Sequence, residues 1–151
     1  MVLYKKILVP TDGSPSAMAA AEFACKLLAG QIGESVTLLV VVSIAKALKD
    51  HPTLNPTQVD EDLVKSKLRH AGRQVISQTG TIFEQMGLSV ESMVEIYDDP
   101  GDRITQIARE QDFDLIVMGN RGRSPVKELI MGSVSNTVMQ EAECPVIIYK
   151  K

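Results

Sequence analysis

Short apolar runs alternate with longer amphipathic segments from one end of the chain to the other, and this alternation limits the possible folds most. The runs are rich in Val, Ile and Leu in continuous order, which is typical of strands buried on both faces of a parallel sheet. The expected strands are Lys6–Val9, Ser35–Val42, Ser89–Val94, Asp114–Met118 and Pro145–Tyr149.

The segments between these runs place apolar residues three or four positions apart, the period of a helix with one buried face. Glycines at 30 and 87 stand where helix C-terminal caps are expected. The stretch 43–56 includes Asp50, His51, Asn55 and two prolines, and is expected to be a surface loop of a length that often forms a lid or binding loop. The expected helices are Ser16–Ala29, Thr57–Met86, Arg103–Gln111 and Ser133–Glu143.

Strand–helix alternation predicts an α/β fold in which one open parallel sheet of five strands is flanked by helices. The 151 residues are enough for one domain, expected over 1–151, with a core that needs no disulfides. Right-handed crossovers favour a flavodoxin-like strand order or the related order 3-2-1-4-5. Ligands bind such sheets beyond the carboxyl ends of the strands where the order reverses, here between the first and fourth strands.

Charge and composition exclude several classes of function. A net charge of -3, 4% aromatic residues and no Trp argue against a nucleic-acid or lipid surface. Two His and two Cys argue against most zinc sites, disulfide scaffolds and His-dependent hydrolases. The apolar run after Lys6 stops at Pro10, too early for a signal peptide, and no run has the length of a membrane span. We expect a cytoplasmic protein with free thiols.

The loop after the first expected strand is Pro10-Thr11-Asp12-Gly13-Ser14-Pro15-Ser16. A carboxylate here, at Asp12, could bind a ribose hydroxyl or a hydrated metal ion. Equally, Asp-Gly and Ser-Pro are turn signals, and Ser14 or Ser16 could cap the following helix. The loop alone is compatible with both interpretations.

The loop after the fourth expected strand has the spacing Gly-x2-Gly-x9-Gly-Ser, formed by Gly119, Gly122, Gly132 and Ser133. Glycines let backbone N–H groups approach a phosphate, and Gly132 would open a helix whose N-terminus favours an anion. Such spacing arises by chance in well under ~1% of chains of this size. The pattern predicts a phosphate-binding loop. Nearby positive charges are Arg121, Arg123 and Lys127.

These motifs together resemble the universal stress protein family of the UspA-like type, over nearly the whole chain. The matching segments are Ile7–Ser14, Asp114–Gly119, Gly132–Ser135 and Cys144–Ile148. The glycine pattern is the one associated with the ATP-binding branch, and the resemblance implies an adenine nucleotide alpha hydrolase-like fold. Family members often have Gly before the Asp-Pro that opens the third helix, where this chain has Asp98 before Asp99-Pro100.

The resemblance also implies a site for ATP, with Mg²⁺ bound through the phosphates. Asp12 would lie near the ribose, with Pro10 and Thr11 facing the adenosine half. Val41 would offer backbone groups to the adenine edge and Met118 would cover one adenine face, although each could equally be a core residue. The ribose and phosphates would be held by Gly119, Gly122, Gly132, Ser133, Val134 and Ser135, with Arg121 alongside.

Motifs for other nucleotide enzymes are missing from the sequence. It contains neither a P-loop nor a dinucleotide-binding fingerprint, it has no nucleophile elbow, and Asp12 is the only candidate for a catalytic base. We therefore expect a nucleotide-dependent stress or regulatory module that binds ATP and hydrolyses it slowly or not at all. The alternatives are a slow ATPase or phosphotransferase, and an interaction module with a vestigial or AMP-binding site.

The last expected strand, with residues 146–149, lies at one edge of the predicted sheet. An uncovered apolar edge favours pairing with another strand. The resemblance implies a homodimer joined through this strand, together with a protein partner that the sequence does not identify.

Overall fold

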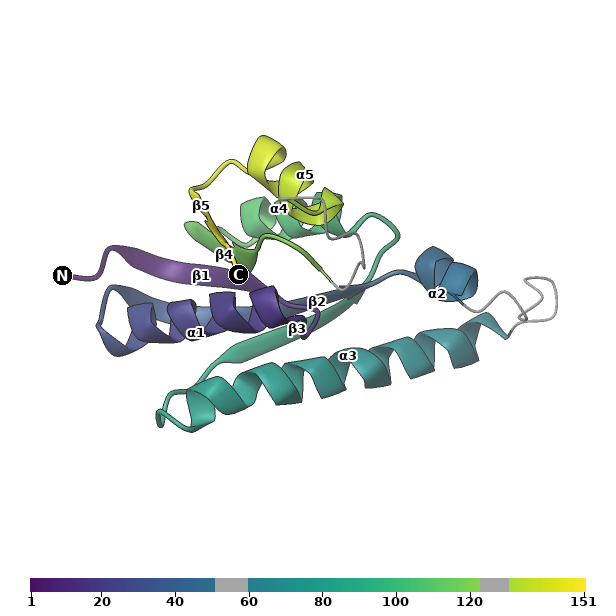
Figure 1. Ribbon diagram of the computed structural model, residues 1–151, viewed down its shortest axis with the longest axis horizontal. Helices are drawn as coiled ribbons and strands as arrows, with labels where there is room; N and C mark the ends of the chain where they lie inside the picture. The colour runs from purple at the N-terminus through teal and green to yellow at the C-terminus, as the bar shows by residue number, and fades with distance from the viewer. Residues whose placement is uncertain (51–59, 123–130) are drawn as a thin grey trace.

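The computed structural model describes residues 1–50, 60–122 and 131–151, which form one parallel sheet with helices on both faces (Figure 1). The strand order β3-β2-β1-β4-β5 confirms the expected order 3-2-1-4-5, and every neighbouring pair is parallel. The central strand β1 pairs with β2 on one side and with β4 on the other. The strands are β1 (Tyr4–Pro10), β2 (Gly33–Val42), β3 (Glu91–Ile96), β4 (Leu115–Gly119) and β5 (Val146–Tyr149).

Helices cover the two faces in pairs, with α1 and α3 on one face and α4 and α5 on the other (Figure 1). Several begin at a side-chain cap: Ser14 accepts a hydrogen bond from the Ala17 N–H of α1, and Asp99 accepts one from the Asp102 N–H of α4. The helices are α1 (Pro15–Ala29), α2 (Ile44–Asp50), α3 (Glu61–Glu84), α4 (Pro100–Glu110) and α5 (Ser133–Glu141).

Two hydrophobic cores result from the alternation of side chains along the strands. Ile7 and Val9 of β1 pack with α1 and α3, whereas Leu8 packs with α4 and α5. Gly72 allows α3 to lie close to the sheet, since a Cβ atom there would be 2.6 Å from Cγ1 of Val94. Both faces of the central strands are therefore buried, as the continuous apolar runs predicted.

Two expectations about the segment after β2 and the start of the next helix need revision. The prediction of a loop over 43–56 is wrong at its start, because residues 44–50 form α2. Ser43 and the distant Asp98 cap this helix, in which no residue is fully buried. Residues 51–59, and with them the expected start of the next helix at Thr57, lie outside the described residues. The described part of α3 begins at Glu61, next to its N-cap Asp60.

Smaller differences occur at the ends of other elements. β3 covers 91–96 rather than 89–94, because its pairing with β2 begins where Glu91 lies opposite Thr37. α4 begins at Pro100, before the expected Arg103, since the Asp99 cap and a proline in the first turn define its start.

Neither cysteine forms a disulfide. Cys25 is buried, Cys144 is half-buried, and burial raises the pKa of each thiol. Among the described helices, none has the length and apolar character needed to cross a membrane.

Candidate functional site

A cleft of about 400 Å³ opens at the carboxyl ends of β1, β2 and β4, where the strand order reverses. The position is the one at which open α/β sheets bind ligands. Every residue that the sequence singled out for the site lines this cleft: Pro10, Thr11, Asp12, Val41, Met118, Gly119, Arg121, Gly122, Gly132, Ser133, Val134 and Ser135.

Asp12 both shapes the first loop and lies in the cleft. Its Oδ1 accepts a hydrogen bond from the Ser14 N–H at 2.9 Å, and Gly13 takes a positive φ of 76°. The turn interpretation of the sequence is therefore correct, and of the two candidate caps, Ser14 and Ser16, the structure has Ser14 as the N-cap of the following helix. The second carboxylate oxygen, Oδ2, lies beside Gly122, at 2.8 Å from where a Cβ on that glycine would be.

Thr11 joins the same loop to α3 through buried hydroxyl groups. Its Oγ1 accepts from the Gly13 N–H and lies 3.2 Å from Oγ1 of Thr79. Thr79 in turn donates to the sulfur of Met18 on α1. The loop between β1 and α1 is thus held by two helices.

The start of α5 and the loop after β4 meet at the backbone oxygen of Asn120. This oxygen accepts hydrogen bonds from the Gly132 N–H at 2.6 Å and from the Ser135 hydroxyl at 2.9 Å. Gly132 is the N-cap of α5 and offers no side-chain oxygen to the first turn. The N–H groups of Ser133, Val134 and Ser135 therefore have no helical acceptor, and the positive end of the helix dipole lies at the cleft.

A Cβ atom would have different surroundings at each of the three glycines of the motif. A Cβ on Gly119 would lie 2.7 Å from the carbonyl carbon of Ser16 and 2.8 Å from the Ala17 nitrogen, so this glycine is required for packing against α1. A Cβ on Gly122 would meet only the Asp12 carboxylate, and one on Gly132 would make ordinary contacts of 3.5–3.7 Å. The expectation that all three face a ligand therefore omitted the packing role of Gly119.

Arg121 lines the cleft, and its guanidinium also reaches the end of the chain, where Nη2 donates to the backbone oxygen of Lys151 at 3.0 Å. Arg123 and Lys127, which the sequence also grouped with this loop, lie outside the described residues. Lys46 of α2 adds a further cation to the cleft lining, and Asp50 adds a carboxylate.

Val41 and Met118 belong to the core and also line the cleft. Met118 is buried in the core between the sheet and the α4–α5 pair, Val41 packs against that core, and both line the cleft. Residues of this kind give the cleft an apolar wall that is continuous with the core.

Sequence reasoning missed the wall that α2 and α3 contribute. Leu68, Ala71 and Val75 of α3 belong to the apolar stripe that predicted the helix, so they were interpreted as core, and the segment of α2 was expected to be a loop. The missed lining residues of these two helices and the turn before α2 are Ser43, Lys46, Ala47, Asp50, Leu68, Ala71, Gly72 and Val75.

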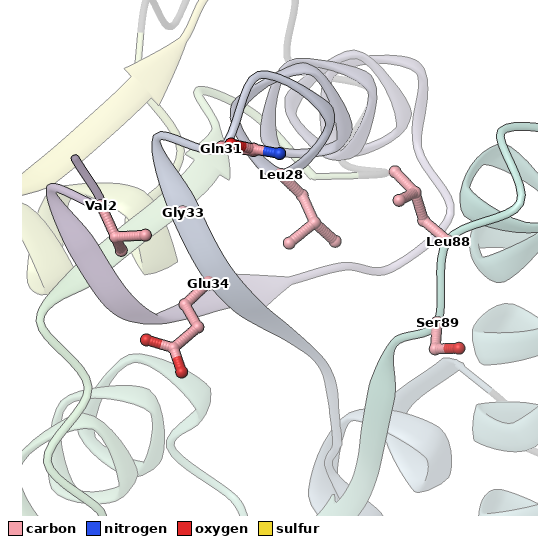
Figure 2. Close-up of a pocket in the computed structure, with 7 residues that line it drawn as sticks. All are labelled: Val2, Leu28, Gln31, Gly33, Glu34, Leu88 and Ser89. Carbon is pink, nitrogen blue, oxygen red and sulfur yellow. The ribbon is translucent and has the colours of Figure 1, made fainter.

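A second hollow, of about 390 Å³, lies at the opposite end of the sheet, where β2 begins (Figure 2). Leu28 from the end of α1 and Leu88 from the segment before β3 both line it, and Glu34 is the ionisable group among the described residues of its lining. None of the predicted site residues lines it.

Comparison with known proteins agrees with this architecture. The universal stress protein family matches residues 3–150. Universal stress protein MJ0577 of Methanocaldococcus jannaschii is 30% identical over 159 aligned residues, which cover 99% of this chain and 97% of that protein. Its solved structure superposes with a TM-score of 0.82, at 28% identity over 99% of this chain and 98% of that one.

Two more distant solved structures have the same fold. A universal stress protein in complex with cAMP has a TM-score of 0.66 at 20% identity, covering 97% of both chains. A family member from Arabidopsis thaliana with AMP bound has a TM-score of 0.58 at 21% identity, covering 97% of this chain and 92% of that one. The match over residues 3–150 and the 30% identity to MJ0577 show that this chain belongs to the universal stress protein family.

Proposed function

We propose that the cleft binds an adenine nucleotide, ATP with Mg²⁺ on its phosphates, and that the protein is a nucleotide-dependent stress or regulatory module. The observation that supports this most is the start of α5. Among the described residues, the N–H groups of its first turn have no side-chain cap, and the turn lies beside the Gly122 backbone in a cleft of sufficient size. Backbone donors at the positive end of a helix dipole suit a phosphate chain.

The other end of the cleft suits a purine base. β1 leaves the sheet after Pro10 pairs with Leu39, and the Thr11 N–H donates to the Leu39 oxygen. Backbone groups alternate in direction along a strand, so those of Val41 point to the same side as those of Leu39. Because β1 no longer lies there, the Val41 N–H and C=O are placed to meet the edge of a base, between apolar side chains such as Met118 and Val75.

The residues present fit Mg²⁺ bound through phosphate oxygens rather than in a cage of protein ligands. Among the described residues, no group of three or more His, Cys, Asp or Glu is placed to hold a metal ion. Mg²⁺ commonly takes one or two carboxylates together with phosphates and water. Asp12 is the carboxylate beside the glycine loop that would be available to such an ion.

Slow or absent hydrolysis follows from the groups around Asp12. Its Oδ1 is held by the Ser14 N–H, and its Oδ2 lies against the Gly122 backbone. Efficient phosphoryl transfer needs a group that positions the attacking water as well as groups that hold the phosphates. That proteins of this fold were solved with AMP or cAMP is consistent with a binding role.

Calorimetric titration of the purified protein with ATP, ADP, AMP and cAMP, each with and without Mg²⁺, tests the proposal. We expect ATP with Mg²⁺ to bind most tightly and phosphate release to remain near background. Absence of binding by all four at millimolar concentration would refute nucleotide binding. Tighter binding of AMP would favour the AMP-binding interaction module, and phosphate release that disappears in Asp12→Ala would favour the slow ATPase.

We also propose a cytoplasmic homodimer joined through β5. The two edges of the sheet differ: the edge strand β3 includes Glu91 and Glu95, whereas β5 has the uncharged sequence Val-Ile-Ile-Tyr. Charged residues protect an edge from pairing, and their absence favours it. Free thiols suit a reducing compartment.

A further inference from the structure

Ser16 is a buried serine in the first turn of α1 that does not line the cleft. Its hydroxyl donates to the backbone oxygen of Arg121 at 2.5 Å and accepts from the Arg121 N–H at 3.4 Å. One side chain on α1 therefore binds both backbone groups of a residue in the loop after β4. Ser14 adds a longer hydrogen bond of 3.4 Å to the same Arg121 oxygen.

These bonds determine the orientation of two successive peptide units. In a planar trans peptide the C=O and the following N–H point in opposite directions. The Asn120 oxygen points to α5, where it accepts from Gly132 and Ser135, and the Arg121 N–H points to Ser16 on α1. In the next unit the Arg121 oxygen points to Ser16, so the Gly122 N–H must point away from α1.

The Gly122 N–H consequently points toward the side on which α5 begins. The Gly122 nitrogen lies 3.7 Å from where a Cβ on Gly132 would be, next to the uncapped first turn. Among the described residues, no hydrogen bond engages this N–H. It adds a donor from the glycine loop to the donors of the helix.

We propose that Ser16 is a positioning residue that turns the Gly122 N–H toward the phosphates of the bound nucleotide. The proposal rests on the proposed function of the cleft. The proposal predicts different effects on the two halves of the ligand. Ser16 acts on the phosphate half only, because the base is expected at Val41 of β2, and β1 lies between β2 and β4. The hydrogen bonds of the Ser16 hydroxyl are to the backbone of Arg121, and neither involves Val41.

Calorimetric titration of wild type and Ser16→Ala with ATP·Mg²⁺ and with adenosine tests this role. We expect Ser16→Ala to weaken ATP binding about tenfold and to leave adenosine binding unchanged. Ser35→Ala is a matched control, because it also removes a hydroxyl-to-carbonyl bond between two segments, Ser35 to Lys5, at the opposite end of the sheet. Equal loss for both ligands, or loss for neither, would overturn the role of Ser16.

A measurement on the wild type makes the test independent of how well the variant folds. The amide resonance of Gly122 should shift on addition of ATP·Mg²⁺ and should not shift on addition of adenosine. An unchanged Gly122 resonance in a protein that does bind ATP would contradict the inference. A wild-type protein that binds no nucleotide would instead contradict the proposed function, so the two failures are distinguishable.

Discussion

Gly119 and Gly132 belong to one sequence motif, yet the structure separates their roles. The nearest neighbours of a Cβ on Gly119 include backbone atoms of α1, at 2.7 and 2.8 Å, which cannot move without shifting the helix. We expect Gly119→Ala to lower the free energy of unfolding by about 1–3 kcal/mol, the usual cost of overpacking. Urea denaturation followed by circular dichroism measures this. Wild-type stability in Gly119→Ala would show that α1 does not restrain this position.

Gly132→Ser is the complementary substitution. A side chain fits at Gly132, whose φ of -75° and ψ of 166° suit an N-cap residue. A serine oxygen there would accept from the first turn of α5, which we expect to leave stability unchanged or raise it by a few tenths of a kcal/mol. The same oxygen would occupy the N–H groups proposed for phosphate.

Affinity for ATP should therefore fall in Gly132→Ser while stability does not. Calorimetric titration and urea denaturation of the same preparation measure the two quantities together. An unchanged ATP affinity would mean that the start of α5 is not the phosphate site. The sequence motif predicted that these glycines belong to one site, but only the packing distances show which of them serves the fold.

At the scale of elements, the helix α2 shows what a periodic pattern misses. Its caps are Ser43, which is adjacent in sequence, and Asp98, which accepts from the Ser43 hydroxyl and the Ala45 N–H. A cap supplied by a residue so far along the chain leaves no local signal. The helix has only seven residues, so its half-buried apolar residues Ile44, Ala47 and Leu48 form too short a stripe to mark it. By contrast, the stripes of α1 and α3 predicted both helices because they face the core.

Asp98 and Asp99 are neighbours that cap different helices, so they form a matched pair. Asp98→Ala removes an acceptor from the first turn of α2, at a typical cost of about 1 kcal/mol to that helix. We expect faster hydrogen exchange at Ala45 and Lys46 and almost no change in global stability, since no residue of α2 is fully buried. Hydrogen exchange by NMR measures the first, and urea denaturation the second.

Asp99→Ala should have the opposite effect. Asp99 caps α4, whose residues Ile104 and Ile107 lie in the core, so its loss should lower global stability by about 1 kcal/mol and leave exchange in α2 unchanged. If both substitutions gave the same result, Asp98 would not hold α2 independently of the core.

At the scale of the whole molecule, strand order was the most predictable property. Alternating elements, buried strands and right-handed crossovers leave few possible strand orders. The strand order then places the loops after β1 and β4, which are distant in sequence, at one cleft. The walls from α2 and α3 could not be predicted in the same way, because the angle at which a helix crosses the sheet depends on contacts such as that between Gly72 and Val94.

The direction of backbone groups on β5 allows a sharp test of the proposed dimer. Pro145 and Tyr149 accept hydrogen bonds from β4 through their backbone oxygens, so the alternate residues Val146 and Ile148 direct their N–H groups to the free edge. Ile148→Pro removes one of these outward donors and keeps every bond to β4. Proline is tolerated on an edge strand with its nitrogen facing outward.

Sedimentation at micromolar concentration should therefore show a dimer for wild type and a monomer for Ile148→Pro. Ile148→Ala is the matched control, because it also loses the packing of Ile148 against the core but retains the N–H, and it should remain dimeric. If Ile148→Pro stayed dimeric, the two protomers would not pair through the β5 backbone. If Ile148→Ala also dissociated, side-chain contacts rather than strand pairing would hold the dimer together.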